Sequence, residues 1–343
     1  MGSLLTVSLD AMGGDHGLPV TVPAAIAALA EYSNLSLILV GDQEQIREAL
    51  SEHDYPNADR MQVQHASQIV EMHDKPAQAM RFKKDSSMRV AINLVKEGRA
   101  DACVSAGNTG ALMATARFVL KMLPGIDRPA ICGILPTTLG FCHMLDMGAN
   151  VDSTADNLFE FAVMGSVLAS AVNNIKSPSV ALLNIGEEEI KGNDAIKQAS
   201  QMLSGSELNY IGYVEGDGIY AGKANVVVCD GFNGNIALKA SEGVAKMFSF
   251  KIKEAFTKNI FTKIAALIAK PVLNNFRKSL DPRRYNGASL LGLQGIAIKS
   301  HGGADELAFK TAIKQAIIEI ENRVPEQISE QLEALLVNQR DDS

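Results

Sequence analysis

The chain contains no tryptophan, and aromatic residues make up only 5% of its 343 positions. Its four cysteines show no Cys-x-x-Cys spacing, which favours buried thiols in a reducing compartment over a disulfide framework or a thiolate metal site; they are Cys103, Cys132, Cys142 and Cys229. The longest uncharged apolar run, at 161–172, is far shorter than the roughly 20 residues that span a bilayer. No secretory leader is recognisable, so we expect a cytoplasmic protein.

Several catalytic and cofactor motifs are also missing. The sequence has no P-loop, no Gly-x-Ser-x-Gly elbow and no His-Glu-x-x-His pair. The nearest approach to a dinucleotide fingerprint, at 216–221, is followed too closely by an apolar strand to open a helix. Acidic residues occur mostly singly, and only His16 and His301 stand beside glycines in candidate loops. We therefore predict no metal and no cofactor.

The pattern of hydrophobic residues predicts an α/β fold. With 47% apolar and 21% charged residues, the chain is globular and long enough for two lobes. Apolar, β-branched runs alternate with helical patterns, which indicates a largely parallel sheet. The expected strands are 4–9, 35–40, 102–105, 130–135, 179–183, 210–214 and 224–229. We expect residues 1–335 to form one two-lobed unit and residues 336–343 to form a flexible tail.

The segments that follow these strands are rich in glycine, asparagine, threonine and lysine. Ligands of open α/β sheets bind at the carboxyl ends of strands, and helix starts there offer backbone N–H groups to anions. Such donor-rich loops can stabilise developing negative charge, although any one of them could be an ordinary strand-to-helix turn. The loops expected to converge on one cleft are 10–16, 105–110, 145–150, 184–192 and 230–235.

Residues 244–280 differ in charge from the rest of the chain. They carry eight lysines and arginines against the single acid Glu254, so this segment contributes +7 and the remainder −14 to a net charge of −7. Apolar residues recur at helical spacing and Pro271 predicts a break, so 244–284 is expected to form a basic amphipathic pair of helices as an excursion within the two-lobed unit. The lysines could be a solvated face above a packed core, or a docking surface for an acidic protein or an anionic membrane. The acidic balance argues against nucleic-acid binding.

Together the loops closely resemble the PlsX family of bacterial acyl-acyl carrier protein:phosphate acyltransferases. The resemblance covers residues 4–330 and rests on seven motifs in order: 10–15, 83–88, 104–111, 128–130, 145–150, 184–192 and 229–235. Each motif is weak alone, and together they are specific. The family commonly has a His-Gly-Ser-Ser/Asn turn, whereas this chain has His301-Gly-Gly-Ala-Asp305, so a hydroxyl role there is in doubt.

The resemblance implies the fold of the isocitrate and isopropylmalate dehydrogenases and of phosphate acetyltransferases. It implies a reversible reaction in which a fatty acyl thioester on acyl carrier protein and inorganic phosphate give acyl phosphate and the free carrier. The product would then feed a membrane glycerol-3-phosphate acyltransferase in phospholipid synthesis. The family's members are homodimers that associate peripherally with the inner face of the cell membrane.

The matching positions suggest roles for individual residues. We expect Lys191 to hold phosphate or offset its charge, with Asn233 and Asn235 facing it as neutral donors. An exposed helix lysine is the alternative for Lys191. The expected substrate-binding residues are Asp10, Gly13, Gly14, Gly107, Asn108, Thr109, Asn184, Glu187, Asp230, Gly231 and His301. The expected residues for docking of the carrier or the membrane are Lys251, Lys258, Lys263, Phe261 and Ile264.

Three other functions fit parts of the sequence. A short-chain phosphate acyltransferase using acyl-CoA would have little need of the basic apolar segment. A metal- and NAD-dependent decarboxylating dehydrogenase shares the related fold. A non-catalytic membrane scaffold would use the basic segment alone.

Overall fold

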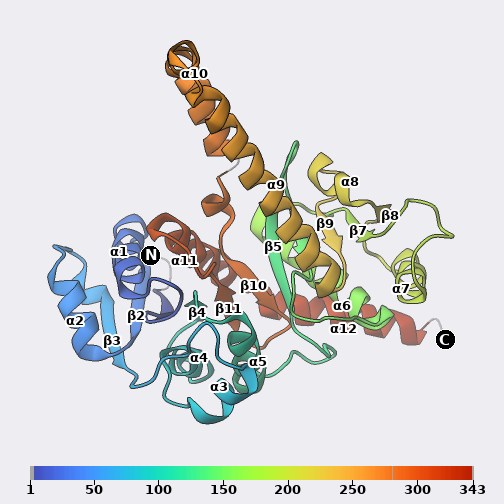
Figure 1. The fold of residues 1–343 in the computed structure, drawn as a ribbon. Coiled ribbons are helices and arrows are strands. Elements are labelled where there is room, and N and C mark those ends of the chain that lie inside the picture. Colours follow the sequence, from blue (N-terminus) through green and yellow to red (C-terminus); the bar gives the residue numbers. More distant parts are fainter. Residues whose placement is uncertain (1–3, 280, 342–343) are drawn as a thin grey trace.

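In the computed structural model, which describes residues 4–279 and 281–341, the chain folds around one eleven-stranded mixed sheet. The strand order is β3-β2-β1-β4-β11-β10-β5-β6-β9-β7-β8 (Figure 1). The strands are β1 (Leu5–Asp10), β2 (Leu35–Gly41), β3 (Met61–His65), β4 (Ala102–Ser105), β5 (Ala130–Thr137), β6 (Gly140–Leu145), β7 (Val180–Leu183), β8 (Tyr210–Val214), β9 (Val226–Val228), β10 (Ala288–Leu291) and β11 (Ile296–Lys299).

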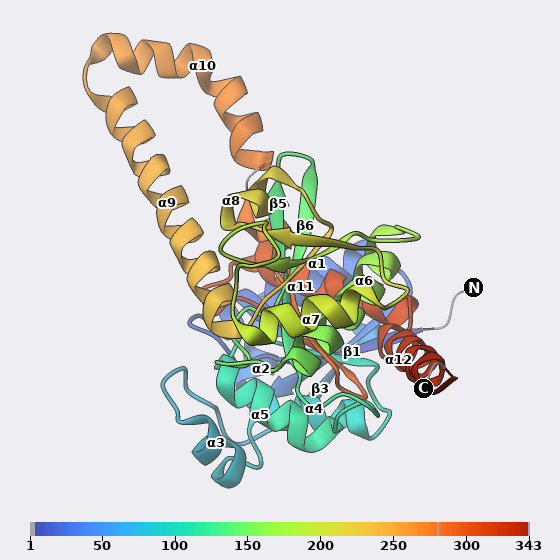
Figure 2. The same ribbon diagram turned by 90° about the vertical axis from the view of Figure 1, so that its right-hand side faces the viewer.

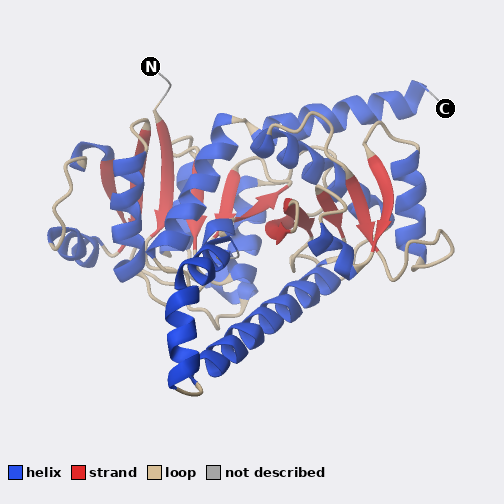
Figure 3. Cartoon of the chain, turned by 90° about the horizontal axis from the view of Figure 1, so that it is seen from above, coloured by secondary structure: helices blue, strands red, loops and turns tan. Residues whose placement is uncertain are grey.

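The sheet divides into two parallel halves joined by antiparallel strands. β3, β2, β1, β4 and β11 are parallel and form the first lobe, while β6, β9, β7 and β8 are parallel and form the second. β10 and β5 lie between them in antiparallel pairing. These antiparallel pairings reverse the strand direction from one half of the sheet to the other. Twist accumulates across the sheet, however, and Figure 3 shows strands at its two ends pointing toward the same side of the molecule. The predicted α/β class and mostly parallel sheet are confirmed.

Helices cover both faces of each lobe. In the first lobe they are α1 (Leu18–Glu31), α2 (Gln43–Ser51), α3 (Pro76–Phe82), α4 (Ser87–Lys96), α5 (Thr109–Leu120) and α11 (Glu306–Glu321). In the second lobe they are α6 (Ala155–Asn173), α7 (Asp194–Ser204), α8 (Gly216–Ala221) and α12 (Val324–Asp341). Two short 3-10 turns lie elsewhere in the chain, one before β3 at Ala58–Arg60 and one before β10 at Pro282–Tyr285. Residues 336–341 therefore continue α12 where a tail was expected, and 342–343 lie outside the described residues.

The lobes have separate cores. In the first lobe, α1 and α11 pack on one face of the sheet around Leu9, Ile298 and Phe309. α4 and α5 pack on the other face, around Ile92 and Leu112. The second core is built on α6, which among the described helices has the length and apolar composition of a membrane span. However, 67% of that stretch is buried, so the structure uses α6 as a core helix.

Two helices leave the body as an arm. α9 (Gly231–Thr257) starts at the second lobe, and α10 (Ile260–Ser279) folds back from its far end (Figures 1 and 2). The expected helical pair is present, but α9 begins before residue 244 and Pro271 lies inside α10 rather than ending it. The alternative in which the apolar residues of this segment pack on the main core does not hold, since Phe261 is 79% and Ile268 78% exposed.

Candidate active site

The first lobe gathers a buried polar network at the ends of β1, β4 and β11. Ser105 Oγ donates to Asp10 Oδ2 at 2.6 Å and accepts from the amide of Gly107 at 3.0 Å. Burial raises the pKa of Asp10, whose Oδ1 is buried without a hydrogen-bond partner among the described residues. Gly13 leaves room for this carboxylate, because a Cβ there would lie 2.4 Å from Asp10 Oδ2. These residues form a buried polar floor.

Lys299 ends β11 inside the same network. Its side chain is buried, and its Nζ donates to the carbonyl oxygens of Ala106, at 3.3 Å, and Ser300. Burial lowers the pKa of Lys299 to about 8, while the carboxylates of Asp10 and Asp15 oppose this shift. One ammonium thus links the segments that follow β4 and β11. Sequence reasoning missed Lys299, although a lysine that closes the apolar run 296–298 was a visible signal.

The start of α5 lies directly above this floor. Asn108 caps the helix by accepting from Ala111 N at 3.0 Å, and its amide donates to the carbonyls of Met72 and Asp74. The N–H groups of Thr109 and Gly110, the first two of the helix, have no acceptor in the part of the chain that the structure describes. Thr109 is exposed, so these amides and its hydroxyl offer donors at the positive end of the helix.

The second lobe organises the ends of β6 and β9 around Asp146. This buried carboxylate accepts from the backbone amides of Ile131, Gly148, Ala149 and Asn150 at 2.6–3.1 Å. Burial nevertheless raises its pKa. Asp146 was part of a recognised motif but was not predicted as a site residue. Its role is to fold the segment 146–150 against the start of α9.

The start of α9 is packed tightly onto that segment. The N–H of Gly231 donates to the carbonyl of Asn150 at 2.8 Å, and Asp230 caps the helix by accepting from Asn233 N. A Cβ at Gly234 would lie 1.9 Å from the carbonyl oxygen of Asp146, so only glycine fits there. Because α9 begins at Gly231, the predicted donors lie in its first turns rather than ahead of it.

The two predicted asparagine donors are not equivalent. Asn233 is exposed, and its amide nitrogen donates to Asp230 Oδ2 at 2.7 Å, so this side chain is already engaged in the cap. Asn235 is exposed beside Gly148, where a Cβ would lie 3.6 Å from that of Asn235. Asn235 is therefore the better placed of the two to contact a substrate.

Lys191 lies in the segment after β7. Its Nζ pairs with Glu188 at 3.0 Å, and its carbonyl accepts from the amide of Asn184 at 3.3 Å. No hydrogen bond joins it to Asn233 or Asn235 among residues 4–279 and 281–341. Asn184 is buried and its Oδ1 has no described partner, while Gly192, at φ +93°, leaves space for this amide. Lys191 is not in a helix, since α7 begins only at Asp194.

The remaining predicted residues have mixed surroundings. Glu187 is exposed and forms an ion pair with Lys223. His301 is exposed, and its Nδ1 accepts from the amide of Gly303 at 3.1 Å, which uses the ring within its own turn. Gly14, at φ +92°, packs against Ala106 and Gly302. The structure thus brings Asp10, Gly13, Gly14 and Gly107 together in one lobe, and Asp230, Gly231, Asn233 and Asn235 in the other.

The cysteines are unsuited to act as nucleophiles. All four are buried free thiols. Burial raises the pKa of Cys103 and of Cys142 to about 12, and raises those of Cys132 and Cys229 as well. The described residues also contain no group of three histidine, cysteine, aspartate or glutamate side chains able to hold a metal. The site is therefore built from hydrogen-bond donors, two buried carboxyl groups and one buried lysine.

Solved structures share this two-lobed architecture. A phosphotransacetylase from Streptococcus pyogenes superposes with a TM-score of 0.61 at 20% identity, covering 92% of this chain and 94% of its own. A Salmonella typhimurium protein assigned as a 4-hydroxythreonine-4-phosphate dehydrogenase gives 0.55 at 12% identity, covering 93% and 99%. The fold places the chain in the class of two-lobed α/β enzymes with the dehydrogenase-like fold.

Sequence similarity then defines the family. The model described as "Fatty acid synthesis protein" matches residues 5–327. A phosphate acyltransferase from Alkalilimnicola ehrlichii is 61% identical over 98% of both chains, and one from Nitrosococcus oceani is 61% identical over 97% of this chain and 98% of its own. The chain therefore belongs to this fatty acid synthesis protein family, the PlsX family, and is an acyltransferase.

Proposed function

We propose that this acyltransferase moves a long-chain fatty acyl group, reversibly, from the thioester of acyl carrier protein to inorganic phosphate. Acyl transfer to phosphate is supported by the family and by relatives named phosphate acyltransferase. A phosphate oxygen attacks the thioester carbonyl, the C–O bond forms as the C–S bond breaks, and the proton of hydrogen phosphate ends on sulfur. The products are acyl phosphate and the free carrier thiol.

Direct attack by phosphate fits the side chains present. A covalent thioester route would need a reactive thiolate, and the buried cysteines with raised pKa cannot supply one. Phosphate at neutral pH is itself ionised and nucleophilic. The protein then has to position two reactants and stabilise the oxyanion, which is work for donors such as amides and lysines.

The start of α5 is the proposed phosphate site, and it is the observation that carries the proposal. Open N–H groups of Thr109 and Gly110 stand at the positive end of a twelve-residue helix. Beneath them Lys299 binds the carbonyl of Ala106 and so fixes the preceding peptide.

The start of α9 is the proposed site of the thioester carbonyl. The side-chain N–H₂ of Asn235 donates no hydrogen bond to another described residue, so it is free to bind a substrate. A neutral donor of this kind stabilises an oxyanion without taking up a proton. Lys191 is the proposed counter-charge, which requires it to exchange Glu188 for the substrate. Because both side chains of this ion pair are partly exposed, breaking it costs little free energy.

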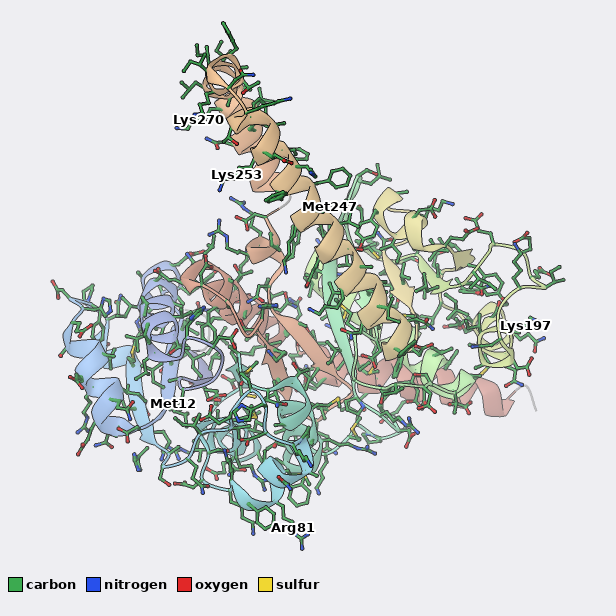
Figure 4. All side chains as sticks on the ribbon, viewed as in Figure 1. Met12, Arg81, Lys197, Met247, Lys253 and Lys270 are labelled. Carbon is green, nitrogen blue, oxygen red and sulfur yellow. The ribbon has the colours of Figure 1, made fainter. Side chains whose placement is uncertain are left out.

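The arm is the proposed surface for partners. Its outer residues mix lysines with exposed apolar side chains, among them Phe261 and Ile264, next to Lys258 and Lys263. Figure 4 shows Lys253 and Lys270 on the part of the arm that projects beyond the body, with Met247 nearer the body on α9. Such a surface suits an anionic membrane or the acidic carrier, and its apolar area is also suited to self-association into a homodimer. A place at the inner face of the cell membrane would deliver acyl phosphate to a glycerol-3-phosphate acyltransferase.

Donor choice tests this proposal. The protein is incubated with phosphate and either palmitoyl-acyl carrier protein or acetyl-CoA, and free thiol is measured together with acyl phosphate trapped as hydroxamate. We expect phosphate-dependent turnover with the palmitoyl carrier. Turnover with acetyl-CoA alone would identify a short-chain enzyme instead, and reduction of NAD by a 2-hydroxy acid with Mg²⁺ would identify a dehydrogenase.

A further inference from the structure

Two cations surround one exposed ring on the outer side of α4 and α5. The guanidinium carbon of Arg89 lies 5.1 Å from the ring centroid of Phe118, and the Nζ of Lys121 lies 5.0 Å from it. Phe118 is 54% exposed. On neighbouring α3, the guanidinium of Arg81 lies 5.6 Å from the ring centroid of Phe82, which is 67% exposed. We call these five residues the cationic face.

The cationic face lacks acidic partners. The sequences of α3, α4 and α5 contain no aspartate or glutamate. Arg89 is half-buried, and burial lowers its pKa, yet its guanidinium has no carboxylate acceptor within the described ranges 4–279 and 281–341. A partly desolvated guanidinium with free donors is a strong site for a carboxylate, since its planar fork can bind both oxygens.

The backbone of Lys121 provides a second, independent observation. This residue ends α5 at φ 68° and ψ 168°, a region that is almost exclusively occupied by glycine. Glycine at this position would relieve the strain but would remove the ammonium above Phe118. Strained backbone of this kind is concentrated at functional sites, where the surrounding structure maintains it.

The cationic face adjoins the candidate active site. Met88, next to Arg89, supports the loop after β4, because a Cβ at Gly107 would lie 2.7 Å from Met88 Cε. Asn108 ties that loop to the carbonyls of Met72 and Asp74, and Asp74 in turn accepts from Lys83 just after α3. A macromolecule seated on α3 to α5 could therefore reach the proposed phosphate site with a flexible attached group.

We propose that the cationic face docks an acidic surface of the protein that carries the acyl thioester. This inference rests on the proposed function and assigns the carrier to α3, α4 and α5 rather than to the arm. Charge complementarity supports it: the chain is acidic overall, with a net charge of −7, so an acidic partner needs a local cationic surface to approach.

A protein fits the cationic face better than a lipid surface does. Both rings carry cations against their faces, so inserting either ring among acyl chains would also bury the charge beside it. The arm instead exposes many uncapped apolar residues, including Phe248, Phe261 and Leu267. Figure 4 places Arg81 at the opposite end of the view from Lys270, and Figure 2 also separates α3 from α10. The two surfaces can thus serve two different partners.

Steady-state kinetics with two donors tests the inference. We expect Arg89→Glu and Lys121→Glu to raise KM for palmitoyl-acyl carrier protein about tenfold or more while kcat stays within about twofold. Palmitoyl-pantetheine, which has no carrier, should be used equally well by wild type and variants. Lys176→Glu, in the exposed segment between α6 and β7, is the matched charge reversal and should leave KM for the carrier unchanged.

Other outcomes would overturn it. An unchanged KM in both cationic-face variants, or equal losses with both donors, contradicts docking at this face. Reduced co-sedimentation with vesicles of anionic lipid, with KM for the carrier unchanged, would assign the face to the membrane instead. Fluorescence anisotropy of labelled carrier measures binding without turnover, so it separates failure of this inference from failure of the proposed reaction.

Lys121→Gly keeps the inference testable if the charge reversals fold poorly. Glycine relieves the φ 68° conformation, so the thermal unfolding midpoint should rise while KM for the carrier also rises. A higher midpoint with unchanged KM would contradict a docking role for Lys121.

Discussion

The hydroxyl of Ser105 donates a 2.6 Å hydrogen bond to the carboxylate of Asp10 and thereby joins the ends of β4 and β1 in a buried setting. The other oxygen of Asp10 already lacks a described partner. Ser105→Ala would remove the hydrogen bond that Asp10 Oδ2 accepts in this buried site. We expect a loss of about 1–3 kcal/mol in the free energy of unfolding, measured by urea denaturation at pH 7.

The control for this prediction is Ser249→Ala in α9. Ser249 donates to the carbonyl of Ala245 on an exposed helix, so its loss should change the free energy of unfolding by less than about 0.5 kcal/mol. Equal stabilities of the two variants would show that the Asp10 network contributes nothing to stability.

Lys299 should make stability depend on pH in the alkaline range. Its folded pKa of about 8 lies below the usual value of 10.5, so between these values the unfolded chain binds more protons. The free energy of unfolding should therefore gain on the order of 3 kcal/mol from this residue as pH rises through that window. Urea unfolding between about pH 7.5 and 10.5 brackets these two pKa values and measures this gain in the free energy of unfolding, which Lys299→Met should remove.

Lys258→Met is the control for Lys299→Met. Lys258 is exposed on the arm, so its removal should leave the pH dependence as in the wild type. We also expect Lys299→Met to lower kcat, because the ammonium holds the Ala106 carbonyl beside the proposed phosphate site. A wild-type slope in Lys299→Met would contradict burial of a charged lysine.

Two glycines of α9 should respond oppositely to the same substitution. Gly234→Ala places a Cβ 1.9 Å from the Asp146 carbonyl oxygen, so the helix start must shift; we expect a destabilisation of about 2–4 kcal/mol and loss of activity. Gly243→Ala meets nothing within 4 Å and should stabilise by about 0.5–1 kcal/mol. Thermal unfolding of both variants checks this, and a tolerated alanine at 234 would refute the tight packing of α9.

The two asparagines of α9 should separate kinetically. Asn235→Ala removes a free donor and should lower kcat about 100- to 1,000-fold, with a small effect on KM for phosphate. Asn233→Ala breaks the tie to Asp230 and should mainly cost stability, about 1 kcal/mol. Steady-state kinetics and urea unfolding of both variants measure this difference. A larger kcat loss for Asn233→Ala would reverse the assignment.

The sequence predicted seven of the eleven strands, together with the glycine-rich loops that follow several of them, because both are local patterns. β3, β6, β10 and β11 escaped detection: β3 mixes polar residues with apolar ones, and β6 is joined to β5 in a hairpin with little turn signal. The pairing of Asn233 with Asp230, and of Lys191 with Glu188, could not be read from spacing alone. Those contacts depend on how each loop folds after its strand.

Lys299 and Asp146 illustrate the same limit for the site. Their importance comes from burial among strands distant in sequence: Lys299 reaches Ala106, and Asp146 accepts from Ile131. The family resemblance supplied the reaction class, whereas the distinction between the α5 and α9 starts required knowing which amides are already bonded.

The most direct test of the account is the fate of phosphate in a single reaction. With palmitoyl-acyl carrier protein and phosphate, thiol release should equal the palmitoyl phosphate trapped by hydroxylamine, and both should vanish without phosphate. Thiol release that continues at the same rate without phosphate, or that yields free fatty acid instead of hydroxamate, would contradict direct transfer of the acyl group to phosphate.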